Sequence, residues 1–138
     1  AAASEVRARQ RTIFTVDTLE YLHRGGRIGG AAKFLGTVLQ LKPVLAIDSN
    51  TARVEAIERV RTRRKALGRV IDIAFEGIDP SRPVRLAVMH AAAPGDAQVL
   101  LESSLACCTP IEQIVGELGP VLGIHGGPGV VGICVHND

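Results

Sequence analysis

The apolar positions along this chain follow two periods, one typical of strands and one typical of helices. Short apolar runs predict strands at residues 11–17, 43–48, 83–91, 111–118 and 130–136. The segment 52–58 alternates apolar and polar side chains and follows the turn sequence Asp48-Ser49-Asn50-Thr51. We therefore expect it to return as the antiparallel hairpin partner of 43–48.

Helical spacing of apolar residues occupies the segments between these runs. It predicts a short helix at 18–24, ended by Gly25-Gly26, and longer helices at 30–40, 61–77 and 95–107. The strand–helix–strand–helix–strand order from 52 to 118 predicts parallel pairing through right-handed crossovers. The sequence thus predicts an α/β fold in which helices pack on a mixed parallel/antiparallel sheet.

Composition narrows the class of protein. With 138 residues, 46% hydrophobic and 22% charged, the chain fits one folded domain, and only 3% aromatics means an aliphatic core. So few aromatic residues, with a net charge of +2, argue against a nucleic-acid partner. No apolar run approaches the ~20 residues of a membrane span. Three cysteines without a secretory signal favour reduced thiols and a cytoplasmic location.

The stretch Gly25–Gly30, GGRIGG, is the first candidate binding motif. It is no dinucleotide loop, because Arg27 stands where that pattern requires glycine. A glycine turn before the helix at 30–40 would present free amides and the helix dipole to an anion. Arg27 would add a bidentate donor for a carboxylate or a phosphate. The residues alone leave two interpretations open, a structural turn and an anion site.

Two other stretches carry candidate chemistry. In HGGPG, residues 125–129, a histidine beside two glycines can approach a ligand closely or simply bond a carbonyl. The run RVRTRRK, residues 59–65, is either a solvated helix start or a docking surface for an acidic partner. No metal site is expected, since the cysteines and histidines lack ligand spacing, and no nucleophile–base–orienter set is present.

Two blocks in the right order resemble the second domain of the DegV family. The first, residues 16–45, reads VDTLEYLHRGGRIGGAAKFLGTVLQLKPVL, which is similar to that family's GGRI block, leucine-rich helix and following strand. The second, residues 117–129, reads ELGPVLGIHGGPG. The basic stretch VRTRRKAL, residues 60–67, also resembles the family's basic helix start.

This resemblance implies a bacterial cytoplasmic carrier that binds a long-chain fatty acid and needs no cofactor. Such a carrier is not an enzyme; it presents the fatty-acid carboxylate to a separate fatty-acid kinase. By motif, the head group would meet Arg27, Gly26 and His125. The acyl tail would be lined by Ile28, Phe34, Leu35, Val38, Leu39 and Pro43. Kinase docking would use Arg59, Arg61 and Arg63.

Two departures from the family pattern change what is expected. Gly126 replaces a usual threonine, which removes a hydroxyl. The chain is also half of the family's usual length, so we expect a single domain, 1–138, without the amino-terminal domain that supplies further carboxylate contacts. Its pocket would be open on one side, and a homodimer could form through the exposed interdomain face. The alternative is an enzyme domain that binds a phosphorylated metabolite at GGRIGG.

Overall fold

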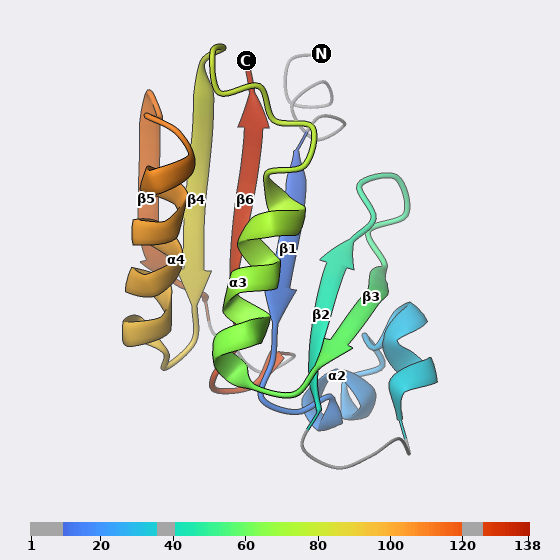
Figure 1. The fold of residues 1–138 in the computed structure, drawn as a ribbon. Coiled ribbons are helices and arrows are strands. Elements are labelled where there is room, and N and C mark those ends of the chain that lie inside the picture. Colours follow the sequence, from blue (N-terminus) through green and yellow to red (C-terminus); the bar gives the residue numbers. More distant parts are fainter. Residues whose placement is uncertain (1–9, 36–40, 120–125) are drawn as a thin grey trace.

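The computed structural model describes residues 10–35, 41–119 and 126–138. These residues form an α/β fold, in which helices pack on a mixed parallel/antiparallel sheet (Figure 1). The sheet has six strands in the order β3-β2-β1-β6-β4-β5. The strands are β1 (Arg11–Thr15), β2 (Lys42–Ile47), β3 (Val54–Val60), β4 (Val84–His90), β5 (Glu112–Glu117) and β6 (Val131–Asn137). The helices are α2 (Glu20–Arg24), the 3₁₀ helix η1 (Gly29–Phe34), α3 (Arg63–Ala74) and α4 (Pro94–Cys107).

Strand pairing confirms the predicted hairpin and corrects one predicted crossover. β2 and β3 pair antiparallel and place β3 at one edge, whereas β4 and β5 pair parallel at the other. The prediction that β3 and β4 pair was wrong, because β2, β1 and β6 lie between them. β6, from the end of the chain, pairs antiparallel with both β1 and β4. Such long-range insertion leaves no local sequence signal.

The main core lies between the sheet and the two long helices, which cover one face of it (Figure 1). β4 and β6 bury every second residue, as expected for strands with one face packed. On the α3 side the same core contains Leu67, Val70 and Ile71. Burying each large aliphatic side chain stabilises the fold by roughly 1.5–3 kcal/mol. The aliphatic core predicted from the scarcity of aromatic residues is therefore confirmed.

A second, smaller apolar cluster forms around α2 and η1. Its buried members are Val16, Leu22, Ala31, Leu45 and Val130. Ile13 belongs to the main core whereas its neighbour Phe14 packs against this cluster, because successive strand residues point to opposite faces. The second cluster thus lies against the face of the sheet that α3 and α4 leave uncovered.

The helix predicted at 30–40 is shorter in the described residues than expected. It is a 3₁₀ helix that ends at Phe34, since Leu35 is already extended, with φ −66° and ψ 142°. Gly29 has φ +52°, and a Cβ there would lie 2.5 Å from the carbonyl oxygen of Val54. Glycine is therefore required where η1 begins, because the chain presses directly on β3. Val38 and Leu39, two of the predicted tail contacts, lie outside the described residues.

α3 is also shorter than the predicted helix 61–77. It starts one residue after Thr62, whose hydroxyl accepts the Lys65 amide at 3.1 Å, and it ends at Ala74. The chain turns away at Gly77, which has φ +75°. Within the described part of the chain, no helix is both long and apolar enough to cross a membrane.

Candidate functional site

The segments that carry the three motifs all leave or enter the sheet at one of its edges. β1, β3, β4 and β5 run in the same direction, so their carboxyl ends share this edge, at the bottom of Figure 1. From it leave the segment that carries GGRIGG and the basic start of α3, and here the segment 126–130 enters β6. In open α/β sheets this edge is where ligands bind.

The GGRIGG turn is held by its own backbone amides. Gly25 and Gly26 donate to the carbonyls of Tyr21 and His23, at 3.0 and 3.2 Å, and the Arg27 amide donates to Leu22 at 2.8 Å. These three amides are therefore not available to an anion, whereas the prediction of free amides at the start of the following helix stays a prediction. The Arg27 side chain is exposed and bonds no other residue in the described part of the chain. Its guanidinium is the group that can bind an anion.

Tyr21 joins the two glycine-rich motifs. A Cβ added at Gly127, whose φ is +81°, would overlap the Tyr21 ring, so this ring packs directly on the backbone of HGGPG. Tyr21 belongs to α2, which leads into GGRIGG. The structure thus brings the two motifs together although about a hundred residues separate them. His125 itself lies outside the described residues, and the next residue, Gly126, is buried.

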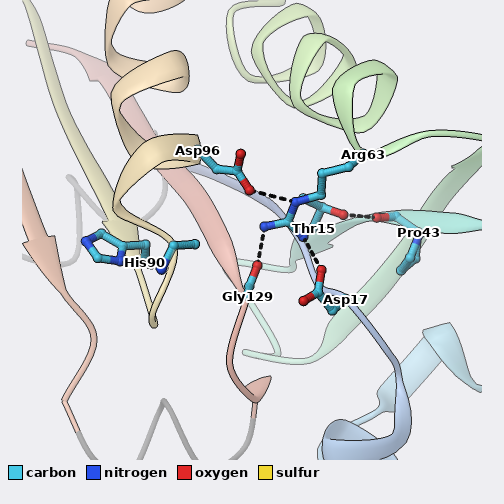
Figure 2. A network of polar contacts seen from close by, with 8 residues as sticks. Thr15, Asp17, Pro43, Arg63, His90, Asp96 and Gly129 are labelled. Atoms are coloured by element: carbon cyan, nitrogen blue, oxygen red, sulfur yellow. Dashed lines mark hydrogen bonds and ion pairs between the residues drawn. The ribbon is translucent and has the colours of Figure 1, made fainter.

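The predicted tail-lining residues divide into three groups. Ile28 and Phe34 are half-buried and pack against the second apolar cluster. Leu35 is 39% exposed. Pro43 is buried in β2, where its carbonyl accepts the Thr15 hydroxyl at 2.7 Å (Figure 2). An aliphatic surface therefore adjoins the Arg27 turn.

The three arginines predicted to dock a partner have different surroundings. The Arg59 guanidinium lies over the Phe34 ring, 5.1 Å from its centroid. Arg61 is exposed. Arg63 is 21% exposed and donates to Asp17, Asp96 and the carbonyl of Gly129 (Figure 2). The basic run is thus not one uniform solvated surface.

Sequence reasoning missed the acidic partners of this network. Asp96 was noticed only as an acidic residue in the first turn of α4, and Asp17 was not singled out. Nothing in their spacing indicates contact, since Asp96 lies 33 residues and Asp17 lies 46 residues from Arg63. His90, which is 6% exposed, uses its Nδ1 to accept the Ala93 amide at 3.1 Å, and its ring lies apart from the network in Figure 2.

The described residues of the site bring together groups that can bind a ligand. They combine an exposed guanidinium, a turn and an adjoining aliphatic cluster. Among the described residues no group of three or more histidine, cysteine or carboxylate side chains could hold a metal ion. Such a surface fits an amphipathic anion with an aliphatic tail.

Comparison with known proteins places the chain in a family. The family model described as "Uncharacterised protein, DegV family" matches residues 1–138, so the chain belongs to the DegV family. A DegV domain-containing protein of Streptomyces coelicolor is 40% identical over 135 residues, which are 97% of this chain and 47% of that protein. Protein DegV of Bacillus subtilis is 35% identical over 130 residues, 94% of this chain and 46% of its own length.

Solved structures agree with the fold. One described as "Fatty Acid Binding of a DegV family Protein from Thermus thermophilus" has a TM-score of 0.82 and 37% identity, covering 94% of this chain and 46% of its own. DegV from Bacillus subtilis, described as a fatty acid binding protein, has a TM-score of 0.81 and 34% identity, covering 99% of this chain and 48% of its own. The chain therefore spans about half the length of the relatives that it matches.

Proposed function

We propose that this chain forms half of a long-chain fatty-acid binding site, with the carboxylate held by Arg27 beside Gly26 and by His125. The observation that carries this is the packing of Tyr21 on Gly127, which brings the GGRIGG and HGGPG motifs together. Arg27 lies within GGRIGG, and its exposed guanidinium is available for an anion. Relatives at 37% and 34% identity are described as fatty acid binding.

The acyl tail would run from the Arg27 turn along the second apolar cluster. Ile28 and Phe34 already pack there, and Leu35 exposes apolar surface. Pro43 is buried in β2, two residues before Leu45, which is a member of this cluster. Val38 and Leu39 complete the proposed lining. Each methylene that leaves water for such a surface contributes about 0.8 kcal/mol, so a long chain supplies most of the affinity.

The proposal makes the protein a cytoplasmic carrier and not an enzyme. It would hold the fatty acid while a separate fatty-acid kinase phosphorylates the carboxylate. The complementary half of its relatives would close the open side of the pocket and add contacts to the head group. The basic residues Arg59 and Arg61 would receive the kinase, and Arg63 takes a different part, argued below.

A site for a phosphorylated metabolite is less well supported. That function needs backbone amides that point at the phosphate. The amides of Gly25, Gly26 and Arg27 instead donate to carbonyls of α2. The Arg27 side chain and the amides where η1 begins remain for such a ligand, and no other observation favours it.

The test is the affinity of the chain for palmitate and for the uncharged 1-hexadecanol, measured by calorimetry. It is done on the chain alone and joined to the complementary half of the Bacillus subtilis protein. Arg27→Gln should weaken palmitate binding about tenfold, because a charged hydrogen bond is lost, and leave hexadecanol binding unchanged. Arg24→Gln is the matched control, since Arg24 is exposed three residues away and pairs with Glu20.

Two results would contradict the proposed role of Arg27. If neither protein form binds palmitate, or if Arg27→Gln and Arg24→Gln bind it equally well, Arg27 does not hold the carboxylate. A phosphate ester without an acyl chain, titrated in parallel, should give no heat. Binding of that ester in place of palmitate would support the metabolite site.

A further inference from the structure

Arg63 has more polar partners than the other side chains of the described site. It stands in the first turn of α3, and its side chain is 21% exposed. Its Nε donates to Asp96 at 2.9 Å, one terminal nitrogen donates to Asp17 at 3.1 Å, and the other donates to the Gly129 carbonyl (Figure 2). The guanidinium thus contacts three separate segments with its planar set of donors.

Each of these three segments is a connection at the ligand-binding edge of the sheet. Asp17 follows β1 and leads into α2 and the Arg27 turn. Asp96 lies in the first turn of α4, after the connection from β4. Gly129 ends the HGGPG motif and enters β6, and its amide donates to the Ala91 carbonyl at 2.7 Å.

The contact between Asp17 and Gly129 is itself close. Gly129 has φ +94°, and a Cβ built there would overlap the Asp17 carboxylate. The Asp17 carboxylate is 55% exposed, so water solvates part of its charge, and a guanidinium that bonds both Asp17 and Gly129 can hold the two segments at this distance. Arg63 supplies that guanidinium, since it donates both to Asp17 and to the carbonyl of Gly129.

We propose that Arg63 is a positioning residue, which fixes the HGGPG segment against the segment leading to Arg27 and so sets the spacing of the two head-group motifs. This rests on the proposed fatty-acid site, although the role concerns how that site is held and not which ligand it takes. Each nitrogen of the Arg63 guanidinium donates a hydrogen bond within the chain, and these contacts fix the position of its side chain. Lysine could satisfy only part of the set, since it is a point charge without the planar fork.

Arg63→Gln and Arg69→Gln form a matched pair. Arg69 lies on the same helix and also bonds two carboxylates, Glu58 and Asp72, but contacts none of the three connections. In the unliganded protein, hydrogen exchange at the Gly129 and Val130 amides should become at least tenfold faster in Arg63→Gln and stay unchanged in Arg69→Gln. Arg63→Lys should give an intermediate rate.

Ligand binding gives the second measurement. Arg63→Gln should weaken palmitate about tenfold more than it weakens 1-hexadecanol, because only the charged head group depends on the spacing of the two motifs. Equal loss for both ligands, or unchanged exchange at Gly129, would overturn the role. If the unmodified protein binds neither lipid, the fatty-acid proposal fails, and the exchange rates still decide whether Arg63 fixes the segment. Should Arg63→Gln not fold, Asp17→Ala removes one contact at an exposed carboxylate and is measured instead.

Discussion

Gly127 and Gly77 share a backbone conformation but differ in what surrounds them. Their φ angles are +81° and +75°, in the left-handed region where a side chain is strained. A Cβ at Gly77 would meet nothing within 4 Å, whereas a Cβ at Gly127 would overlap the Tyr21 ring. Alanine substitutions at these two glycines therefore separate the stability lost through backbone strain from the stability lost through a clash with Tyr21.

Gly77→Ala should lower the free energy of unfolding by about 1 kcal/mol, the strain of alanine at positive φ. Gly127→Ala should lower it by about 2–4 kcal/mol, because overpacking against Tyr21 adds to that strain. Chemical denaturation checks both values. In the double variant Gly127→Ala, Tyr21→Ala the two losses should be less than additive, because the ring is gone. Full additivity would mean that Tyr21 does not pack on this glycine.

At the scale of the helices and strands, the hydrophobic pattern predicted all six strands of the described sheet to within a few residues. It succeeded because β4 and β6 bury alternate residues and the period is visible locally. It failed for residues 30–35, which form a 3₁₀ helix that ends at Phe34 and begins where Gly29 lies against Val54. That contact is made across the fold, so no window of sequence reveals it.

The candidate site was predictable only in its motifs. Glycines at 25–30 and 126–129 indicated turns, and Arg27 stood out as the charged residue within one of them. The Arg63 network was not predictable, because its partners are contributed by three connections that only the strand order brings together. A basic run in the sequence looks alike whether its charges are solvated or paired.

At the scale of the whole molecule, the outer strand β5 is an exposed apolar edge. Ile114 and Val115 of β5 are 52% and 46% exposed, and Ile111, just before the strand, is 56% exposed; an exposed edge strand can pair with another chain. We expect weak, concentration-dependent self-association, measured by sedimentation velocity. Ile114→Lys should abolish it, whereas Val99→Lys, at an equally exposed position on α4, should not. Identical sedimentation of all three proteins at every concentration would exclude dimerisation through β5.

The proposed docking of a fatty-acid kinase can be tested at the exposed arginine that follows β3. Arg61 is exposed at the carboxyl end of β3, next to the connection into α3, and its charge is free to meet an acidic surface. Arg61→Glu should cut the rate at which a fatty-acid kinase phosphorylates bound palmitate about tenfold and leave palmitate affinity unchanged, because repulsion acts on the encounter. Arg82→Glu makes the same charge change at an exposed residue of the connection between α3 and β4, at the opposite end of the sheet, and should change neither quantity. Arg59→Glu should reduce both, since Arg59 also lies over Phe34. If Arg61→Glu lowers palmitate affinity as much as it lowers phosphorylation, this residue supports the lipid site and does not receive the kinase.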